Sequence, residues 1–154
     1  MKYDDASWHY ESIENANDEN DRWDKASSHI VIYLKWCFGK GFIRPENDDA
    51  RIALLAAANG NGSFTEYFIN WCDCKLIDHD LSDEGKRFTA DYYELYLDEL
   101  GKVANNHILR SPVNEYPFEA IKNALDDRFL LWQSEGKSAF SKLSKINHPW
   151  WKIW

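Results

Sequence analysis

The strongest constraint on the fold is the spacing of large apolar residues near the C-terminal end of the chain. Between Pro117 and Gly136 they recur every three or four positions, at Phe118, Ile121, Leu125, Phe129 and Trp132. That spacing places them on one face of an α-helix, which repeats about every 3.6 residues. Because proline is tolerated in a first helical turn and glycine commonly follows a last one, the pattern predicts a long helix over residues 117–136.

Four further segments carry helical signals after a residue that can cap a helix N-terminus. The candidate caps are Ser27 or Ser28, Asn47, Ser63 and Ser82, and Ser63 with Glu66 matches the capping box. The segment after Ser28 is apolar around most of its circumference, which predicts a central helix. A short helix over residues 139–146 completes the pattern.

Length and composition together indicate one hydrophobic core. The chain has 154 residues, of which 44% are hydrophobic and 16% aromatic, so it holds ample apolar surface for a single domain. We therefore expect an all-α fold, one compact domain of five or six helices over residues 1–154. Residues 1–25 are expected to form an extended, acidic N-terminal arm, residues 26–146 the helical body and residues 147–154 a Trp-rich tail.

Charge and hydropathy limit the cellular compartments and the classes of partner that we expect for this chain. The chain has 26 acidic and 18 basic side chains, a formal net charge of −8, which disfavours direct nucleic-acid binding and favours basic partners. The first residues are polar and the longest apolar run, Ile30 to Leu34, is too short to span a bilayer. The three cysteines are an odd number, so we expect reduced thiols, as in the cytoplasm. We expect a cytoplasmic protein without a membrane partner.

Acidic residues are concentrated before and within the helix that follows Ser82. A solvated helix face would explain them, but we expect an electrostatic docking surface for a basic protein, because complementary charge accelerates association. The predicted partner-binding residues are Asp78, Asp80, Asp83, Glu84, Asp91, Glu94 and Asp98.

Local catalytic signatures are missing from the sequence, which contains no GxSxG, P-loop, GxGxxG, HExxH or CxxC motif. No cofactor and no catalytic residue is therefore predicted. One alternative is a small metal-dependent or acid/base enzyme that uses Asp4, Asp5 and His9, with His29 brought near by folding. Another is a homo-oligomeric scaffold assembled through Trp150, Trp151 and Trp154, whose large apolar surface must be covered.

Two resemblances bear on function. The opening MKYDDASWHY, the segment from Ser28 to Trp36, and the stretch from Trp71 to Tyr93 resemble a family of small, uncharacterised bacterial proteins. This resemblance covers roughly the first 97 residues and implies no activity. In size, acidity and lack of a catalytic motif, the chain is also similar to bacterial immunity proteins of contact-dependent inhibition and related systems.

The second resemblance implies a specific task. Immunity proteins of this type are cytoplasmic, and each binds one cognate toxin domain tightly, often a nuclease. The leading hypothesis is therefore an antitoxin that binds a basic toxin, an RNase, through the acidic residues before and within the helix that follows Ser82.

Overall fold

The computed structural model describes residues 1–103 and 111–143 of the chain. The described part is a mostly helical single domain with one small sheet, which confirms the predicted fold class. The elements, in chain order, are β1 (Lys2–Asp5), α1 (Ser7–Tyr10), α2 (Glu19–Gly39), α3 (Asp48–Ala58), α4 (Phe64–Trp71), β2 (Lys75–Ile77), the 3-10 turn η1 (Asp78–Asp80), α5 (Asp83–Val103), the 3-10 turn η2 (Val113–Glu115), α6 (Phe118–Glu135) and α7 (Ser138–Leu143).

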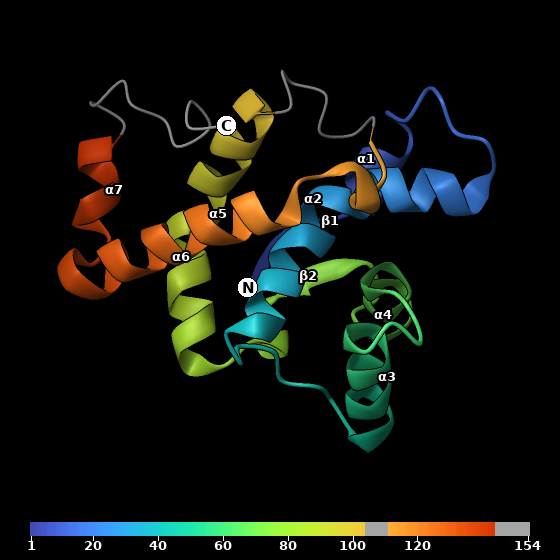
Figure 1. Ribbon diagram of the computed structural model, residues 1–154, viewed down its shortest axis with the longest axis horizontal. Coiled ribbons are helices and arrows are strands. Elements are labelled where there is room, and N and C mark those ends of the chain that lie inside the picture. Colours follow the sequence, from blue (N-terminus) through green and yellow to red (C-terminus); the bar gives the residue numbers. More distant parts are fainter. Residues whose placement is uncertain (104–110, 144–154) are drawn as a thin grey trace.

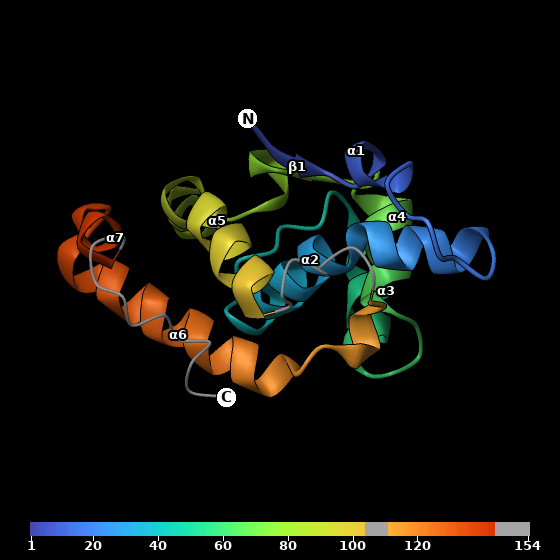
Figure 2. The same ribbon diagram turned by 90° about the horizontal axis from the view of Figure 1, so that it is seen from above.

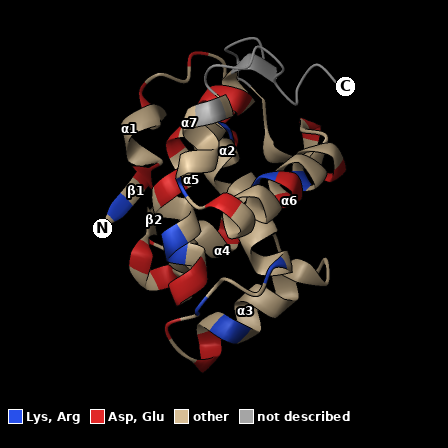
Figure 3. Cartoon of the chain, turned by 90° about the vertical axis from the view of Figure 1, so that its left-hand side faces the viewer, with Lys and Arg blue, Asp and Glu red and all other residues tan. Residues whose placement is uncertain are grey.

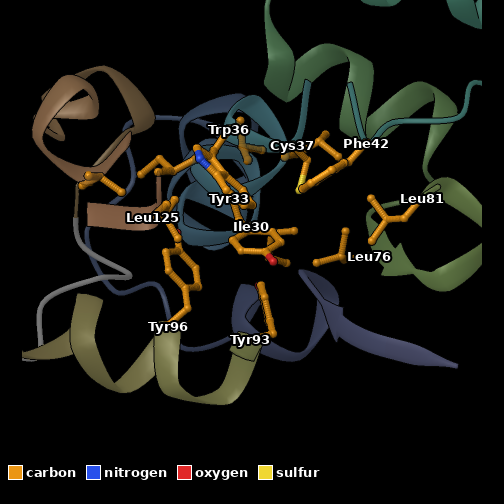
Figure 4. Close-up of a cluster of buried hydrophobic side chains, with 14 of the residues drawn as sticks. Ile30, Tyr33, Trp36, Cys37, Phe42, Leu76, Leu81, Tyr93, Tyr96 and Leu125 are labelled. Carbon is orange, nitrogen blue, oxygen red and sulfur yellow. The ribbon is translucent and has the colours of Figure 1, made fainter. Parts of the chain in front are cut away.

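Helix α2 lies at the centre of the domain, as its sequence predicts. In two perpendicular views it lies among the β1–β2 sheet, α4, α5 and α6 (Figures 1 and 2). Every residue from Ala26 to Leu34 is buried, so this stretch contacts protein around its whole circumference. Figure 4 shows Ile30, Tyr33 and Trp36 projecting from α2 into the core.

The start of α2 differs from the prediction. The helix begins at Glu19, and the Asp18 side chain caps it by accepting a hydrogen bond from the backbone N–H of Asp21 at 2.8 Å. Ser27 and Ser28 are not caps, because they lie inside the helix and donate to the carbonyls of earlier residues. The first two turns are rich in acidic and amide side chains, so they resemble a solvated loop in sequence.

The N-terminal segment is also more structured than the expected arm. β1 pairs antiparallel with β2, with Asp4 opposite Leu76 and Asp5 opposite Lys75. Asp4 and Asp5 are both only 3% exposed. The arm predicted over residues 1–25 is therefore wrong in its extent, because residues 2–5 form a sheet and residues from 19 onward belong to α2.

The remaining helices begin and end close to the capping residues that the sequence predicts. Ser63 and Glu66 form the capping box of α4, and Asn47 caps α3. Gly136 follows the last residue of α6 with a positive φ of 66°, which glycine adopts readily. The Trp-rich tail, with Trp150, Trp151 and Trp154, lies outside the described residues. Within the described ranges, no helix is both long and apolar enough to cross a bilayer.

Candidate functional site

A buried carboxylate with two histidines is the most unusual polar cluster in the described part of the chain. The Asp4 Oδ1 atom lies 3.1 Å from Nε2 of His9, and Oδ2 lies 3.1 Å from Nε2 of His29. The Tyr93 hydroxyl donates to Oδ2 at 3.0 Å, and the Asp5 backbone N–H donates to Oδ1 at 2.7 Å. We refer to Asp4, His9, His29 and Tyr93 as the Asp4 cluster.

Four separate elements bring the Asp4 cluster together. Asp4 lies on β1, which is held in place by pairing with β2 and by the bond from the Ala6 N–H to the Cys74 carbonyl. The short helix α1 follows immediately and turns His9 back toward the strand. His29 comes from the buried middle of α2, and its ring meets that of His9 edge-on at 4.7 Å. Tyr93 comes from α5, far along the chain.

The charges in the cluster follow from burial and hydrogen bonding. Burial alone would raise the pKa of Asp4, but the hydrogen bonds from His29 and His9 outweigh it and hold the pKa well below its usual range. Burial lowers the pKa of His29, and the neighbouring Asp4 only partly offsets this. At neutral pH the cluster therefore combines an ionised Asp4 with a neutral His29, whose Nε2–H donates to the carboxylate.

The cluster partly matches the predicted Asp4, Asp5 and His9 group. The structure brings His9 and His29 to Asp4, as the hypothesis required. It does not bring Asp5, whose carboxylate instead accepts from Lys2 Nζ at 2.8 Å and from Ser7 Oγ at 2.6 Å. Sequence reasoning missed Tyr93, because its position in α5 fits the apolar helical pattern and gives no other signal. Asp4, His9 and His29 each offer a ligand atom within 4.8 Å of the others.

A separate cavity lies away from this cluster. It encloses about 820 Å³ between α2, α4 and the start of α6, beside Phe64 and Phe118. Asp24 at its edge already accepts from the Thr65 hydroxyl at 2.7 Å and from the Val113 N–H at 3.0 Å. Lys35 lies over the Phe118 ring at 4.1 Å. The cavity therefore offers a largely apolar surface whose charged side chains are already engaged.

The predicted acidic docking residues divide into two groups. Asp78, Asp80 and Asp83 lie at η1 and at the start of α5. In this group the Asp78 carboxylate is 2.9 Å from the N-terminal amino group, and Asp83 is 2.8 Å from Lys86 Nζ. Both charges are thus neutralised within the protein, which weakens them as docking groups.

Asp80 is a poor docking charge for a different reason. Burial raises its pKa to about 6, and the nearby carboxylates of Glu46 and Asp78 add to this, while the Ile77 N–H and His79 oppose it. Its Oδ2 atom is buried and has no hydrogen-bond partner among the described residues. A fraction of Asp80 is therefore protonated near neutral pH.

Replacing Asp80 by Asn is expected to stabilise the protein at neutral pH. A carboxyl whose folded-state pKa is raised favours folding below its unfolded pKa, near 4, and loses that contribution as the pH rises through about 6. The gain in unfolding free energy should be near zero at pH about 4 and reach about 1 kcal/mol at pH about 7.5, reduced by partial solvation. Urea unfolding across this range measures it. Asp83→Asn is the control and should show no such gain, and a gain independent of pH would contradict the argument.

The second group forms an outward stripe along α5. Glu84, Asp91, Glu94 and Asp98 follow one another at helical spacings, and Glu84, Glu94 and Asp98 are exposed. Asp91 is half-buried and accepts from Trp132 Nε1 at 2.9 Å. Figure 3 shows acidic positions following α5 along its length. We refer to these four residues as the acidic stripe.

Comparison with known proteins places the chain in a family. Residues 2–114 match the model of a family described as a domain of unknown function, DUF7832. The match includes the Asp4 cluster and the acidic stripe, and it ends before α6. The comparisons with curated proteins and with solved structures gave no match. Because the family model covers most of its length, the chain belongs to the family described as a domain of unknown function, DUF7832.

Proposed function

We propose that the protein is an immunity-type inhibitor that binds a basic nuclease toxin domain through the acidic stripe of α5. The observation that carries this proposal is the exposure of Glu84, Glu94 and Asp98 along one side of a helix in a protein of net charge −8. Nucleases bind phosphate backbones through basic surfaces, so an acidic surface can compete for the same groove. Inhibition by this route requires no catalytic residue and no cofactor.

The packing beneath the acidic stripe should hold it rigid as a docking surface. The opposite side of α5 is packed into the core through Phe88, Tyr92 and Tyr96, all with 0% exposure. Asp91 is tied to Trp132 of α6, which fixes the stripe relative to the next helix. A surface that is already ordered loses little conformational entropy on binding, which favours high affinity.

The proposed inhibitor acts in the cytoplasm, where a nuclease toxin would meet its nucleic-acid substrate. The three cysteines, Cys37, Cys72 and Cys74, are unpaired, and free thiols suit a reducing compartment. The helical composition of the described residues, without a membrane-spanning helix, is compatible with this location.

Reversing two charges of the stripe should abolish capture of the partner. Glu94→Lys/Asp98→Lys changes the charge along α5 by four units, and both side chains are exposed, so the fold should persist. We expect the association rate with a basic nuclease domain to fall at least about tenfold. Affinity capture from the native lysate identifies the retained protein, and a nuclease assay with that protein tests inhibition.

A matched control separates the position of the charge from its amount. Glu11→Lys/Glu14→Lys makes the same change of net charge at exposed positions between α1 and α2, away from α5 (Figure 1). The proposal requires a basic nuclease that binds the wild type and this control but not the stripe variant, with binding weakened as salt rises. Equal loss in both variants, or a captured protein without nuclease activity, would contradict it.

A further inference from the structure

We propose that Asp4, His9 and His29 form a binding site for a single Zn²⁺ ion. Imidazole nitrogen and carboxylate oxygen are common zinc ligands, and two histidines with one carboxylate are sufficient for a site that leaves its fourth position to water. In this chain the three side chains come from β1, α1 and α2 and converge on one point.

The spacing of the donor atoms fits a zinc ion. With metal–ligand distances of about 2.0–2.2 Å, neighbouring ligands of a tetrahedral ion lie about 3.3–3.6 Å apart. Asp4 contacts His9 Nε2 through Oδ1 and His29 Nε2 through Oδ2, both at 3.1 Å, slightly closer than two ligands of a bound ion would lie. Donor atoms of all three residues lie within 4.8 Å of one another, so small side-chain rotations can bring them around one ion.

The surroundings of Asp4 resemble the outer shell of a metal site. The Tyr93 hydroxyl and the Asp5 backbone N–H both donate to the carboxylate and fix its orientation. Such partners of a ligating carboxylate hold it in the geometry that the metal requires. In the absence of an ion the His29 Nε2–H donates to Asp4, so zinc binding at Nε2 requires the imidazole proton to move to Nδ1, which has no hydrogen-bond partner among the described residues.

The exposure of the three ligands indicates the side from which the ion would enter. Asp4 and His29 are almost completely buried, with side-chain exposures of 4% and 1%, whereas the His9 side chain is 28% exposed. An ion would therefore enter beside His9, and the fourth position would be open to solvent on that side. Tyr93 reaches the site from the buried side of α5, opposite the acidic stripe, so the zinc proposal is independent of the proposed inhibition.

Titration of Zn²⁺ into the chelator-treated full chain, in competition with a chromophoric chelator, tests the site. The wild type should bind one zinc per chain, and His9→Ala should weaken binding by at least about 100-fold because it removes a direct ligand. His79→Ala is the matched control, since His79 is an exposed histidine outside the cluster, and it should bind as the wild type does. Tyr93→Phe, which alters only the outer shell, should weaken binding by about 10–100-fold.

Two further readouts keep the test independent of folding. Circular dichroism should show that His9→Ala retains its helical content, because the His9 side chain is partly solvated. In the wild type, one equivalent of zinc should shift the ring-proton NMR signals of His9 and His29 and leave those of His79 unchanged. Absence of binding, more than one equivalent bound with similar affinity, or equal binding by the folded His9→Ala variant would overturn the proposal.

Discussion

Replacing Arg128 by Met is expected to lower the free energy of unfolding by about 3–5 kcal/mol, the cost of breaking a buried ion pair. Arg128 Nη2 lies 2.8 Å from Oε1 of Glu99, and their side chains are 12% and 4% exposed. The Tyr92 hydroxyl donates to the other carboxylate oxygen at 2.6 Å. Methionine keeps the apolar stem of the arginine but leaves Glu99 without this cation in a buried position. Urea unfolding at pH 7 measures the loss.

A second substitution identifies the cause of that loss. Glu99→Gln in the Arg128→Met background removes the buried negative charge and retains an oxygen that can accept from Tyr92. We expect the double variant to be more stable than the Arg128→Met variant, because a neutral amide costs less to bury than a carboxylate. If Arg128→Met costs less than about 1 kcal/mol, as for an exposed pair, the argument is wrong.

Most helices of this chain could be predicted because their signals are local. The capping box of α4 is complete in the structure, with the Ser63 Oγ accepting at 3.0 Å and the Glu66 carboxylate accepting at 3.1 Å. Asn47 likewise accepts from the Ala50 N–H at 2.9 Å. Each of these contacts joins residues three positions apart, so the sequence alone contains all the partners.

The start of α2 shows where local reading fails. The first turns of this helix are polar and lack the apolar periodicity that indicates a buried face. The cap is Asp18, within a run of acidic and amide residues in which several positions could serve equally well. Serine is a residue type that can cap a helix, but Ser27 and Ser28 lie in the buried interior of α2 and therefore do not cap it.

The Asp4 cluster depends on contacts that sequence patterns do not encode. β1 has only four residues, too few to show an alternating pattern, and its residues pair with residues of β2 that lie 70–75 positions later in the chain. Tyr93 and Asp4 are 89 residues apart. The sequence could therefore suggest His9 as a neighbour of Asp4 and name His29 as a further candidate, but only the tertiary fold places His29 there, adds Tyr93 and removes Asp5.

The internal contacts of the predicted acidic residues could not be read from the sequence for a related reason. Net charge can be counted from the sequence, whereas internal pairing depends on the fold. The ion pair of Asp78 with the N-terminal amino group and the hydrogen bond of Asp91 with Trp132 both join residues that are distant in sequence. Of the seven predicted residues, Asp83, Glu84, Glu94 and Asp98 are exposed, and Asp83 is paired with Lys86.

Trp36→Ala is expected to destabilise the protein by about 3–5 kcal/mol, because it leaves a cavity where α2, α5, α6 and the segment between α2 and α3 meet. Trp36 is 1% exposed, and its ring lies 5.4 Å from Phe88 of α5 and 6.1 Å from Phe129 of α6. Its indole N–H donates to Asp126 of α6 at 3.0 Å. Thermal and urea unfolding of the full chain measure the effect.

Trp8→Ala is the matched control, since Trp8 is 59% exposed and should cost less than about 1 kcal/mol. A similar loss in both variants would contradict a core centred on Trp36.

The comparison also bears on the extent of the domain, because the family match ends at residue 114 and Phe129 lies beyond it. If Trp36→Ala has the expected cost, and Phe129→Ala weakens the same core, then α6 completes the hydrophobic core of the family region in this protein.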